Sequence, residues 1–499
     1  MRSKCASLSL LAIVLWAATA HAGEFQDDLK ARRARALERL GPDSMLVLYS
    51  AAARTYSRDI EYEYRQDSNL YYLTGIEQEE TILVLMPGNA KSREILFVKA
   101  RNPMREHWQG TLLSLEEATA RSGIETVRLT GEFEAFIEAV LSGLPFSLSD
   151  ETSADEYARF FSALSAGKAG LYLSGPEAGP EGPGTAAQRL AARAKDRVAG
   201  CAVHDAADLL RDLRVLKTQF ERQVLQRSVQ IAAEAQKAGM KAARPGAFEF
   251  SVKAAIEYVY RARGAYGWSY PPIVGSGPNA TILHYGGSRR RMEAGDLLLV
   301  DAACNYEYLT GDITRTYPAS GTFTEPQKDL YRIVLRAYDE GRKFAGAGVS
   351  LADIHKRIGE VMRQGLLEIG LVTDPSGDQY RLWMTHGTTH YVGMDVHDVG
   401  SNQKPLEPGM AYAMEPGIYI REAALEGLEK NAENAAFIAK VRPLVEKYRD
   451  IGIRIEDTFL MTEEGLQSLS DDVPRTIEAV EAFMRAPAAG REGPGRAPR

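Results

Sequence analysis

The sequence predicts a mixed α/β (α+β) fold arranged as two domains. The chain has 499 residues, which exceeds the usual size of one domain, and its 45% hydrophobic and 25% charged residues are ordinary for a globular protein. Strand-like runs alternate with helical stretches in the first part, whereas longer amphipathic helices precede clusters of strands in the second. We therefore expect an N-terminal domain over residues 23–204 and a C-terminal domain over residues 205–475.

The segment before the first domain has the three parts of an export signal. Arg2 and Lys4 precede an apolar run at 8–20, and the small-residue pattern "AHA" follows it. We expect a signal peptide over residues 1–22, cleaved after Ala22, and a periplasmic or secreted protein. No later window of about 20 apolar residues occurs, so the mature protein should have no stable membrane span.

Composition indicates which kinds of partner the protein binds and whether its cysteines form a disulfide. The net charge is −7, and no strongly basic stretch indicates binding to nucleic acid. Two cysteines follow the signal segment, Cys201 and Cys304. They could form a disulfide in an oxidising compartment, but we expect both to be small buried residues.

The spacing of apolar and turn residues predicts the helices, strands and loops of the N-terminal domain. Residues 24–44 are predicted to be helical and residues 175–184 to form an exposed loop. The predicted strands, from their apolar runs and turn residues, are 45–52, 68–76, 81–88, 94–100 and 171–175.

The C-terminal domain begins with a long amphipathic helical region at 209–243. The predicted elements that follow are a turn and helix within 243–265, strands within 296–318, helices at 326–345 and 351–370, and strands and turns over 382–461. The tail 485–499 is rich in Pro, Gly and Arg, which predicts disorder.

Four acidic residues lie in strand-like sequence, and three of them directly follow an apolar run. Asp301 follows "LLLV", Glu415 follows "AYAM" and Glu456 follows "GIRI", while Asp312 lies on the segment next to Asp301. A buried carboxylate is costly unless a cation or hydrogen-bond donors accompany it. A strand-end carboxylate that accepts backbone N–H bonds is the simpler explanation for any one of them. Four together, with one imidazole, suit a pair of divalent ions, with Mn²⁺ the first candidate and Co²⁺ or Zn²⁺ possible.

The stretch "HGTTHYVGMDVHDVG" at 386–400 carries three histidines. A zinc-protease helix of the HExxHxxGxxH type needs a glutamate and a third histidine where this chain has Gly387 and Val396. Its glycines, threonines and tyrosine also disfavour a helix. The alternative is a strand-like stretch with one metal ligand and two histidines that face a substrate, although spacing alone does not choose the ligand. His284, in "NATILHYGG", is either structural or part of the same site.

These motifs together resemble the creatinase, aminopeptidase P and methionine aminopeptidase superfamily, which has the pita-bread fold. The resemblance covers residues 209–470, and residues 64–88 also resemble the N-terminal domain of aminopeptidase P and prolidase. The segments that carry it are "IVGSGPNATILHY", "GDLLLVDAACNYEYLTGDITRTYP", "HGTTHYVGMDVHDVG", "MAYAMEPGIYI" and "GIRIEDTFLMT".

The resemblance implies a role for each matching residue. The implied metal ligands are Asp301, Asp312, His390, Glu415 and Glu456. Asp312 and Glu456 would bridge the two ions, and Glu415 would also act as general base. His284 and His397 would contact the substrate and assist catalysis, and His386 would line the pocket for proline. Arg454, which shares a strand face with Glu456, would orient the ligands from behind.

The implied activity is hydrolysis of an N-terminal Xaa–Pro bond through a metal-bridging hydroxide. The alternative is a prolidase restricted to Xaa–Pro dipeptides, because both enzymes share the ligand set. Residues 421–450 extend a connection that is short in compact relatives, so the resemblance does not determine which residues form the rim of the pocket. A metal-free amidinohydrolase or a non-catalytic binding module fits less well, because all five ligand positions are intact.

The resemblance also implies a homo-oligomer, dimer or tetramer, with the N-terminal domain at the contact. Trp108 in "REHWQG" either reaches the active site of a neighbouring subunit or is an ordinary core or edge residue.

Overall fold

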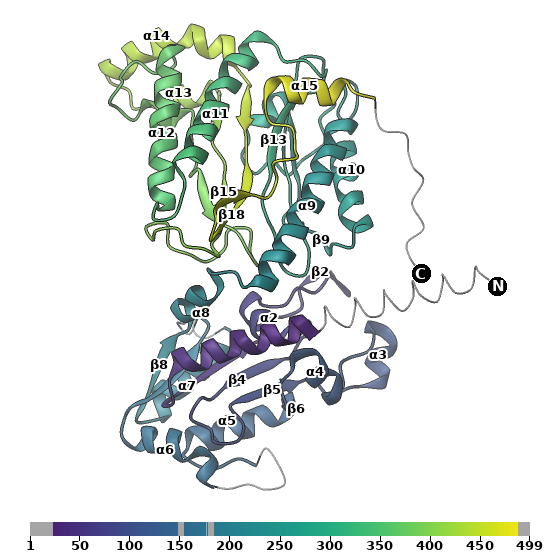
Figure 1. Ribbon diagram of the computed structural model, residues 1–499, viewed down its shortest axis with the longest axis vertical. Helices are drawn as coiled ribbons and strands as arrows, with labels where there is room; N and C mark the ends of the chain where they lie inside the picture. Colours follow the sequence, from purple (N-terminus) through teal and green to yellow (C-terminus); the bar gives the residue numbers. More distant parts are fainter. Residues whose placement is uncertain (1–22, 148–153, 176, 178–183, 488–499) are drawn as a thin grey trace, which may run out of the picture. The chain divides into compact units, whose positions relative to one another are not determined.

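The computed structural model describes residues 23–147, 154–175, 177 and 184–487. They divide into two compact units between Arg214 and Val215 (Figure 1). The predicted signal peptide, most of the predicted loop at 175–184 and nearly all of the predicted tail lie outside the described residues. Within the described part of the chain, no helix combines the length and apolar character needed to cross a membrane.

The first unit contains a six-stranded mixed sheet with the order β6-β5-β4-β1-β7-β8. The central strand β1 pairs antiparallel with β4 and parallel with β7. The strands are β1 (Ser44–Tyr49), β2 (Thr55–Ser57), β3 (Ile60–Glu61), β4 (Ile82–Leu85), β5 (Glu94–Val98), β6 (Thr126–Leu129), β7 (Ala169–Leu173) and β8 (Cys201–Asp205). The helices are residues 23–40, α2 (Ser68–Thr74), α3 (Pro103–Gln109), α4 (Leu115–Ser122), α5 (Phe133–Leu141), α6 (Ala158–Ser165), α7 (Ala186–Arg197) and α8 (Ala207–Arg214).

The strand predicted at 68–76 is wrong, because this segment forms helix α2. The Asp67 carboxylate caps it by accepting hydrogen bonds from the amides of Asn69 and Leu70. Gly75 ends it in the left-handed conformation, with φ of 66°. All residues from Leu70 to Thr74 are buried, so the segment lacks the polar face that normally distinguishes a helix from a buried strand.

The second unit repeats one arrangement twice, a pair of helices followed by an antiparallel sheet (Figure 1). The first half consists of α9 (Gln219–Ala242), α10 (Glu249–Ala262), β9 (Gly267–Trp268), β10 (Ile273–Ser276), β11 (Leu297–Asp301), β12 (Cys304–Asn305) and β13 (Thr314–Pro318). The second half consists of α11 (Glu325–Phe344), α12 (Leu351–Glu368), β14 (Thr389–Tyr391), β15 (Ala411–Met414), β16 (Gly417–Tyr419), α13 (Ala423–Glu426), α14 (Ala432–Tyr448), β17 (Gly452–Arg454), β18 (Asp457–Thr462), β19 (Gly465–Ser468) and α15 (Ile477–Arg485). The main sheets are β10-β11-β13 and β14-β15-β18-β19.

Helix positions agree with the sequence analysis at 326–345 and 351–370. The helical region predicted at 209–243 is confirmed as well, but it is divided between α8 of the first unit and α9, because Thr218 begins α9 with a capping box that Glu221 closes. Both cysteines are free: Cys304 is buried, as expected, and Cys201 is partly exposed.

The prediction of only strands and turns over 382–461 is also wrong, because the extended connection contains α14. The side chain of Asn431 caps its first turn, and Phe437, Val441 and Val445 are buried in the apolar core of the unit. The Lys447 ammonium and the Tyr448 hydroxyl both lie 3.0 Å from a carboxylate oxygen of Asp329 on α11. The extra residues are therefore held against α11.

Candidate metal centre

The first half of the second unit supplies two aspartates. Asp301 is the last residue of β11, where it pairs with Thr314 of β13, and Asp312 lies just before β13. They are 8% and 5% exposed. The Asp312 amide donates to the Thr458 hydroxyl at 2.7 Å, and that hydroxyl donates back to the Asp312 carbonyl at 2.8 Å. A residue of β18 thus fixes the backbone of an aspartate from the other half.

The second half supplies an imidazole and two glutamates. His390 lies in the middle of β14, Glu415 directly follows β15, and Glu456 lies between β17 and β18. The pairing of β14 with β15 and of β15 with β18 brings these three positions to neighbouring strand ends. His390 Nε2 lies 3.7 Å from Asp312 Oδ2, 3.7 Å from Glu415 Oε1 and 3.6 Å from Glu456 Oε1.

Several carboxylates lie close together in this cluster, and burial and their mutual repulsion shift the pKa values of its residues. Burial and then the neighbouring Glu456 and Asp301 raise the pKa of Asp312 well above its ordinary value. Burial and Glu456 raise the pKa of Glu415 to about 8. Burial lowers the pKa of His390, but the carboxylates of Glu456 and Glu415 outweigh it and raise that pKa to about 9. The cluster holds more negative charge than its own side chains neutralise.

The residues present fit a divalent cation. Asp312, His390 and Glu456 each offer one ligand atom, and these three atoms lie within 4.8 Å of one another. Glu456 Oε1 is buried and has no hydrogen-bond partner among the described residues. Buried acceptors are nearly always paired, and mixed oxygen and imidazole donors suit Mn²⁺, Co²⁺ or Zn²⁺.

Arg454 lies behind the carboxylates, as the sequence predicts. Its Nη2 contacts Asp301 Oδ2 at 2.5 Å, its Nε donates to the Thr314 hydroxyl at 3.1 Å, and its Nη1 donates to the Tyr419 hydroxyl at 2.8 Å. Thr314 in turn donates to Glu456 Oε2 at 2.6 Å. Arg454 and Thr314 therefore fix the orientation of both halves' carboxylates.

Sequence reasoning missed three residues of the site: Tyr270, Thr314 and Tyr419. The Tyr270 hydroxyl lies within hydrogen-bond distance of the carboxylates of both Asp301 and Asp312, and it donates to one at a time. Tyr419 and Thr314 fall inside the motifs "EPGIYI" and "GDITRT". Their position in motifs already assigned to the site could therefore have identified them. Tyr270 lies in "GWSYPP", which carries no such signal.

The three histidines of 386–400 do not share a helix, so the zinc-helix alternative is excluded. His386 Nε2 lies 2.8 Å from the Tyr419 hydroxyl, and burial lowers its pKa to about 4. The His397 ring stacks on His390 with centroids 4.0 Å apart, and burial and then His390 lower the His397 pKa to about 4. His284 is exposed and close enough to His397 to act on its pKa.

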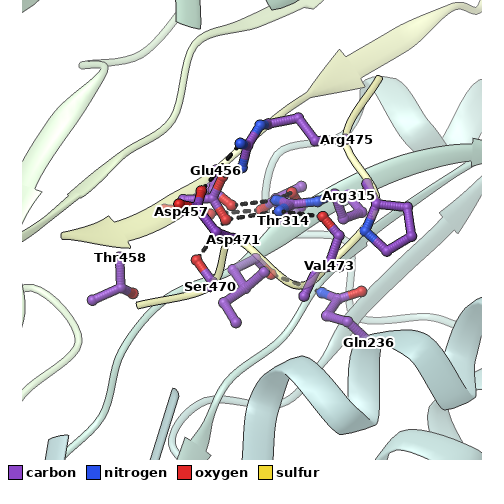
Figure 2. Close-up of polar contacts among 12 residues, drawn as sticks. Gln236, Thr314, Arg315, Glu456, Asp457, Thr458, Ser470, Asp471, Val473 and Arg475 are labelled. Carbon is purple, nitrogen blue, oxygen red and sulfur yellow. Dashed lines mark hydrogen bonds and ion pairs between the residues drawn. The ribbon is translucent and has the colours of Figure 1, made fainter. Parts of the chain in front are cut away.

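A fully buried ion pair between Arg315 and Asp457 lies directly beside Glu456 (Figure 2). Arg315 Nη2 contacts Asp457 Oδ1 at 2.7 Å, and neither side chain is exposed to solvent. Arg315 Nη1 also donates to the carbonyls of Thr314 and Glu456, at 3.0 and 2.6 Å. Asp457 accepts a further hydrogen bond from Arg475 at 2.8 Å. The pair therefore joins β13 to β18 beside Glu456 of the cluster.

Comparison with known proteins agrees with this fold and with a metal-binding function. The family model described as "Metallopeptidase family M24" matches residues 223–463, and "Aminopeptidase P, N-terminal domain" matches residues 29–146. The predicted order of an aminopeptidase P-like domain followed by a metallopeptidase domain is therefore confirmed. These matches indicate a metallopeptidase.

Comparison with individual relatives identifies the branch of the metallopeptidase family. The chain is 31% identical over 472 residues to "Xaa-Pro aminopeptidase" of Escherichia coli (strain K12), covering 92% of this chain and 98% of the relative. It is 30% identical over 454 residues to "Xaa-Pro aminopeptidase 3" of Homo sapiens, covering 88% and 81%. The solved structure "aminopeptidase P from E. coli with the inhibitor Pro-Leu" matches with a TM-score of 0.76 and 30% identity, covering 92% of this chain and 98% of that one. The chain therefore belongs to the Xaa-Pro aminopeptidase branch of metallopeptidase family M24.

Replacing Arg315 should destabilise the second unit strongly. Arg315→Met removes one of the two arginines that contact the buried Asp457 carboxylate, together with the bonds to the Thr314 and Glu456 carbonyls, and loss of one partner of a buried ion pair costs about 3–5 kcal/mol. Urea unfolding should show this loss, whereas Arg336→Met, which breaks the exposed pair with Glu368, should cost less than about 1 kcal/mol. Equal, small effects from both variants would contradict a supporting role for the buried pair.

Proposed function

We propose that this chain is a metal-dependent aminopeptidase that hydrolyses the N-terminal Xaa–Pro bond of peptides. The observation that carries the proposal is Glu456 Oε1, which is buried, accepts no hydrogen bond from the described residues and lies 3.6 Å from His390 Nε2 within a cluster of acidic side chains. The names of the relatives, which match over most of both chains, support the same substrate class.

We propose that two divalent ions, most readily Mn²⁺ and alternatively Co²⁺ or Zn²⁺, bind at this cluster. The proposed ligands are Asp301, Asp312, His390, Glu415 and Glu456. Asp312 and Glu456 would contribute to the same ion as His390, because one ligand atom from each of these three residues lies within 4.8 Å of the others. When bound, such ions polarise a carbonyl and lower the pKa of a water molecule.

The protein's own residues then move protons and orient the peptide. The Glu415 carboxylate takes the proton of the attacking water and returns it to the leaving proline nitrogen. His284 and His397 contact the substrate, and His386, held by the Tyr419 hydroxyl, lines the proline side. The peptide bond before proline is a tertiary amide, which has no N–H. The pocket therefore needs no hydrogen-bond acceptor opposite the proline nitrogen.

Variants separate the proposed ligand from the proposed substrate contacts. Glu415→Ala should abolish turnover and weaken binding of one ion, because both a ligand and a proton carrier are removed. His284→Ala should keep the metal content and lower kcat. Metal content by mass spectrometry and turnover are measured together, with exposed Glu407→Ala as the control. Full activity of Glu415→Ala with bound metal would refute the assignment.

Peptide length distinguishes the proposed activity from that of a prolidase. The metal-supplemented enzyme is incubated with matched Xaa–Pro dipeptides and Xaa–Pro–Xaa tripeptides, and release of the first residue is measured. We expect cleavage of the tripeptides. Cleavage confined to dipeptides would identify a prolidase instead, and cleavage of neither would reject both activities.

We also propose that the chain is exported to the periplasm or secreted, which residues 1–22 support by their charge and apolar pattern. Sequencing the N-terminus of the protein recovered from a bacterial periplasm should find Gly23 first. An uncleaved N-terminus, or retention in the cytoplasm, would contradict this proposal.

We propose in addition that the protein forms a homo-oligomer through its first unit. Trp108 and Met104 of α3 support this, because they are 84% and 79% exposed, which excludes the alternative of a core tryptophan. Sedimentation velocity should detect a dimer or tetramer that Trp108→Ser weakens.

A further inference from the structure

Glu249 is a buried carboxylate that the proposed chemistry does not use. It is the first residue of α10 and is 0% exposed. A negative charge there is favoured by the helix dipole. The hydrogen bonds of its carboxylate, however, go to residues between Ser276 and Arg290 instead of to α10.

The two carboxylate oxygens hold opposite ends of one loop, residues 277–290, here called the His284 loop. Oε1 accepts from the Ser276 amide at 2.7 Å, the Ser276 hydroxyl at 2.8 Å and the Asn279 side chain at 3.1 Å. Oε2 accepts from the Tyr285 hydroxyl at 3.0 Å and the Arg290 amide at 3.0 Å. One side chain therefore joins the start of the loop to its end.

The hydrogen bonds of Glu249 include one from Tyr285, the residue next to His284. The Tyr285 hydroxyl also accepts from the Asn279 side chain at 3.0 Å, so Tyr285 is held from two directions. His284 itself is exposed and acts electrostatically on His397, whose ring stacks on His390. Ala280, in the same loop, is buried in one apolar cluster with Tyr419 of the site.

We propose that Glu249 is a positioning residue, which holds the His284 loop so that His284 meets the peptide substrate. This inference rests on the proposed function, because it takes His284 as a substrate contact. Glu249 touches neither the substrate nor the metal cluster, and it acts only through the loop. Its loss should therefore impair catalysis through His284 while the metal ligands stay intact.

The test combines Glu249→Gln with His284→Ala in a double-mutant cycle. Glutamine keeps the size, but its amide nitrogen cannot accept the bond from the Arg290 N–H. We expect kcat/KM for a Xaa–Pro–Xaa tripeptide to fall about 10- to 100-fold, with metal content unchanged. In the His284→Ala background, the same change should lower kcat/KM by less than about twofold. Glu257→Gln, on the same helix, is the matched control and should change nothing.

Several outcomes would overturn the proposal. Activity of Glu249→Gln within about twofold of the original, or a full additional loss in the His284→Ala background, would show that Glu249 does not act through His284. Loss of bound metal would place its effect at the cluster instead. Should Glu249→Gln fold poorly, Tyr285→Phe removes one bond to Oε2 and must show the same dependence on His284.

A measurement without turnover separates this proposal from the proposed function. Glu249→Gln should speed amide hydrogen exchange across residues 277–290, and Glu257→Gln should not. If the unaltered enzyme cleaves no proline peptide, the proposed function fails even when the exchange result holds. Unchanged exchange in Glu249→Gln, in an active enzyme, refutes the positioning role alone.

Discussion

Repulsion between four largely buried carboxylates is the constraint on which the second unit depends. Asp301, Asp312, Glu415 and Glu456 approach one another where little water screens their charges, and burial and mutual repulsion raise the pKa of Asp312 and Glu415. Arg454 and His390 supply part of the opposing charge. The positive charge that is still missing is the physical reason for a divalent cation, which would also coordinate Glu456 Oε1, a buried oxygen that accepts no hydrogen bond from the described residues.

The halves of the unit meet through threonine side chains and separate main-chain hydrogen bonds, such as that from the Glu456 amide to the Thr314 carbonyl at 3.0 Å, and these replace a continuous ladder of strands. Thr314 donates to the Glu456 carboxylate, Thr316 donates to the Arg454 carbonyl at 3.0 Å, and Thr458 donates to the Asp312 carbonyl. Thr314 and Thr316 share one face of β13 because alternate residues of a strand point the same way. Each of these bonds ends at a residue of the cluster or at Arg454, so the contact between the halves also sets the geometry of the site. The Arg315–Asp457 pair reinforces the same contact from behind (Figure 2).

The chemistry of the site was more predictable from sequence than its surroundings. A carboxylate directly after an apolar run, as at Asp301 and Glu456, is costly unless a partner exists, so sequence alone indicates a function. The helix α2 was not predictable from periodicity, because nearly all of its residues are buried and no polar stripe remains. Tyr270 and Glu249 were missed for another reason: their partners are distant in sequence, and only the folded chain brings them together.

The most direct measurement is an anomalous difference map from crystals grown with Mn²⁺, recorded at the manganese absorption edge. The account predicts two peaks about 3.5–4 Å apart between the Asp312 and Glu456 carboxylates, the spacing of two-metal hydrolytic sites. A single peak would show that the cluster binds one ion and not two. No peak at the cluster, in an enzyme that remains active on Xaa–Pro–Xaa peptides, would contradict its central claim.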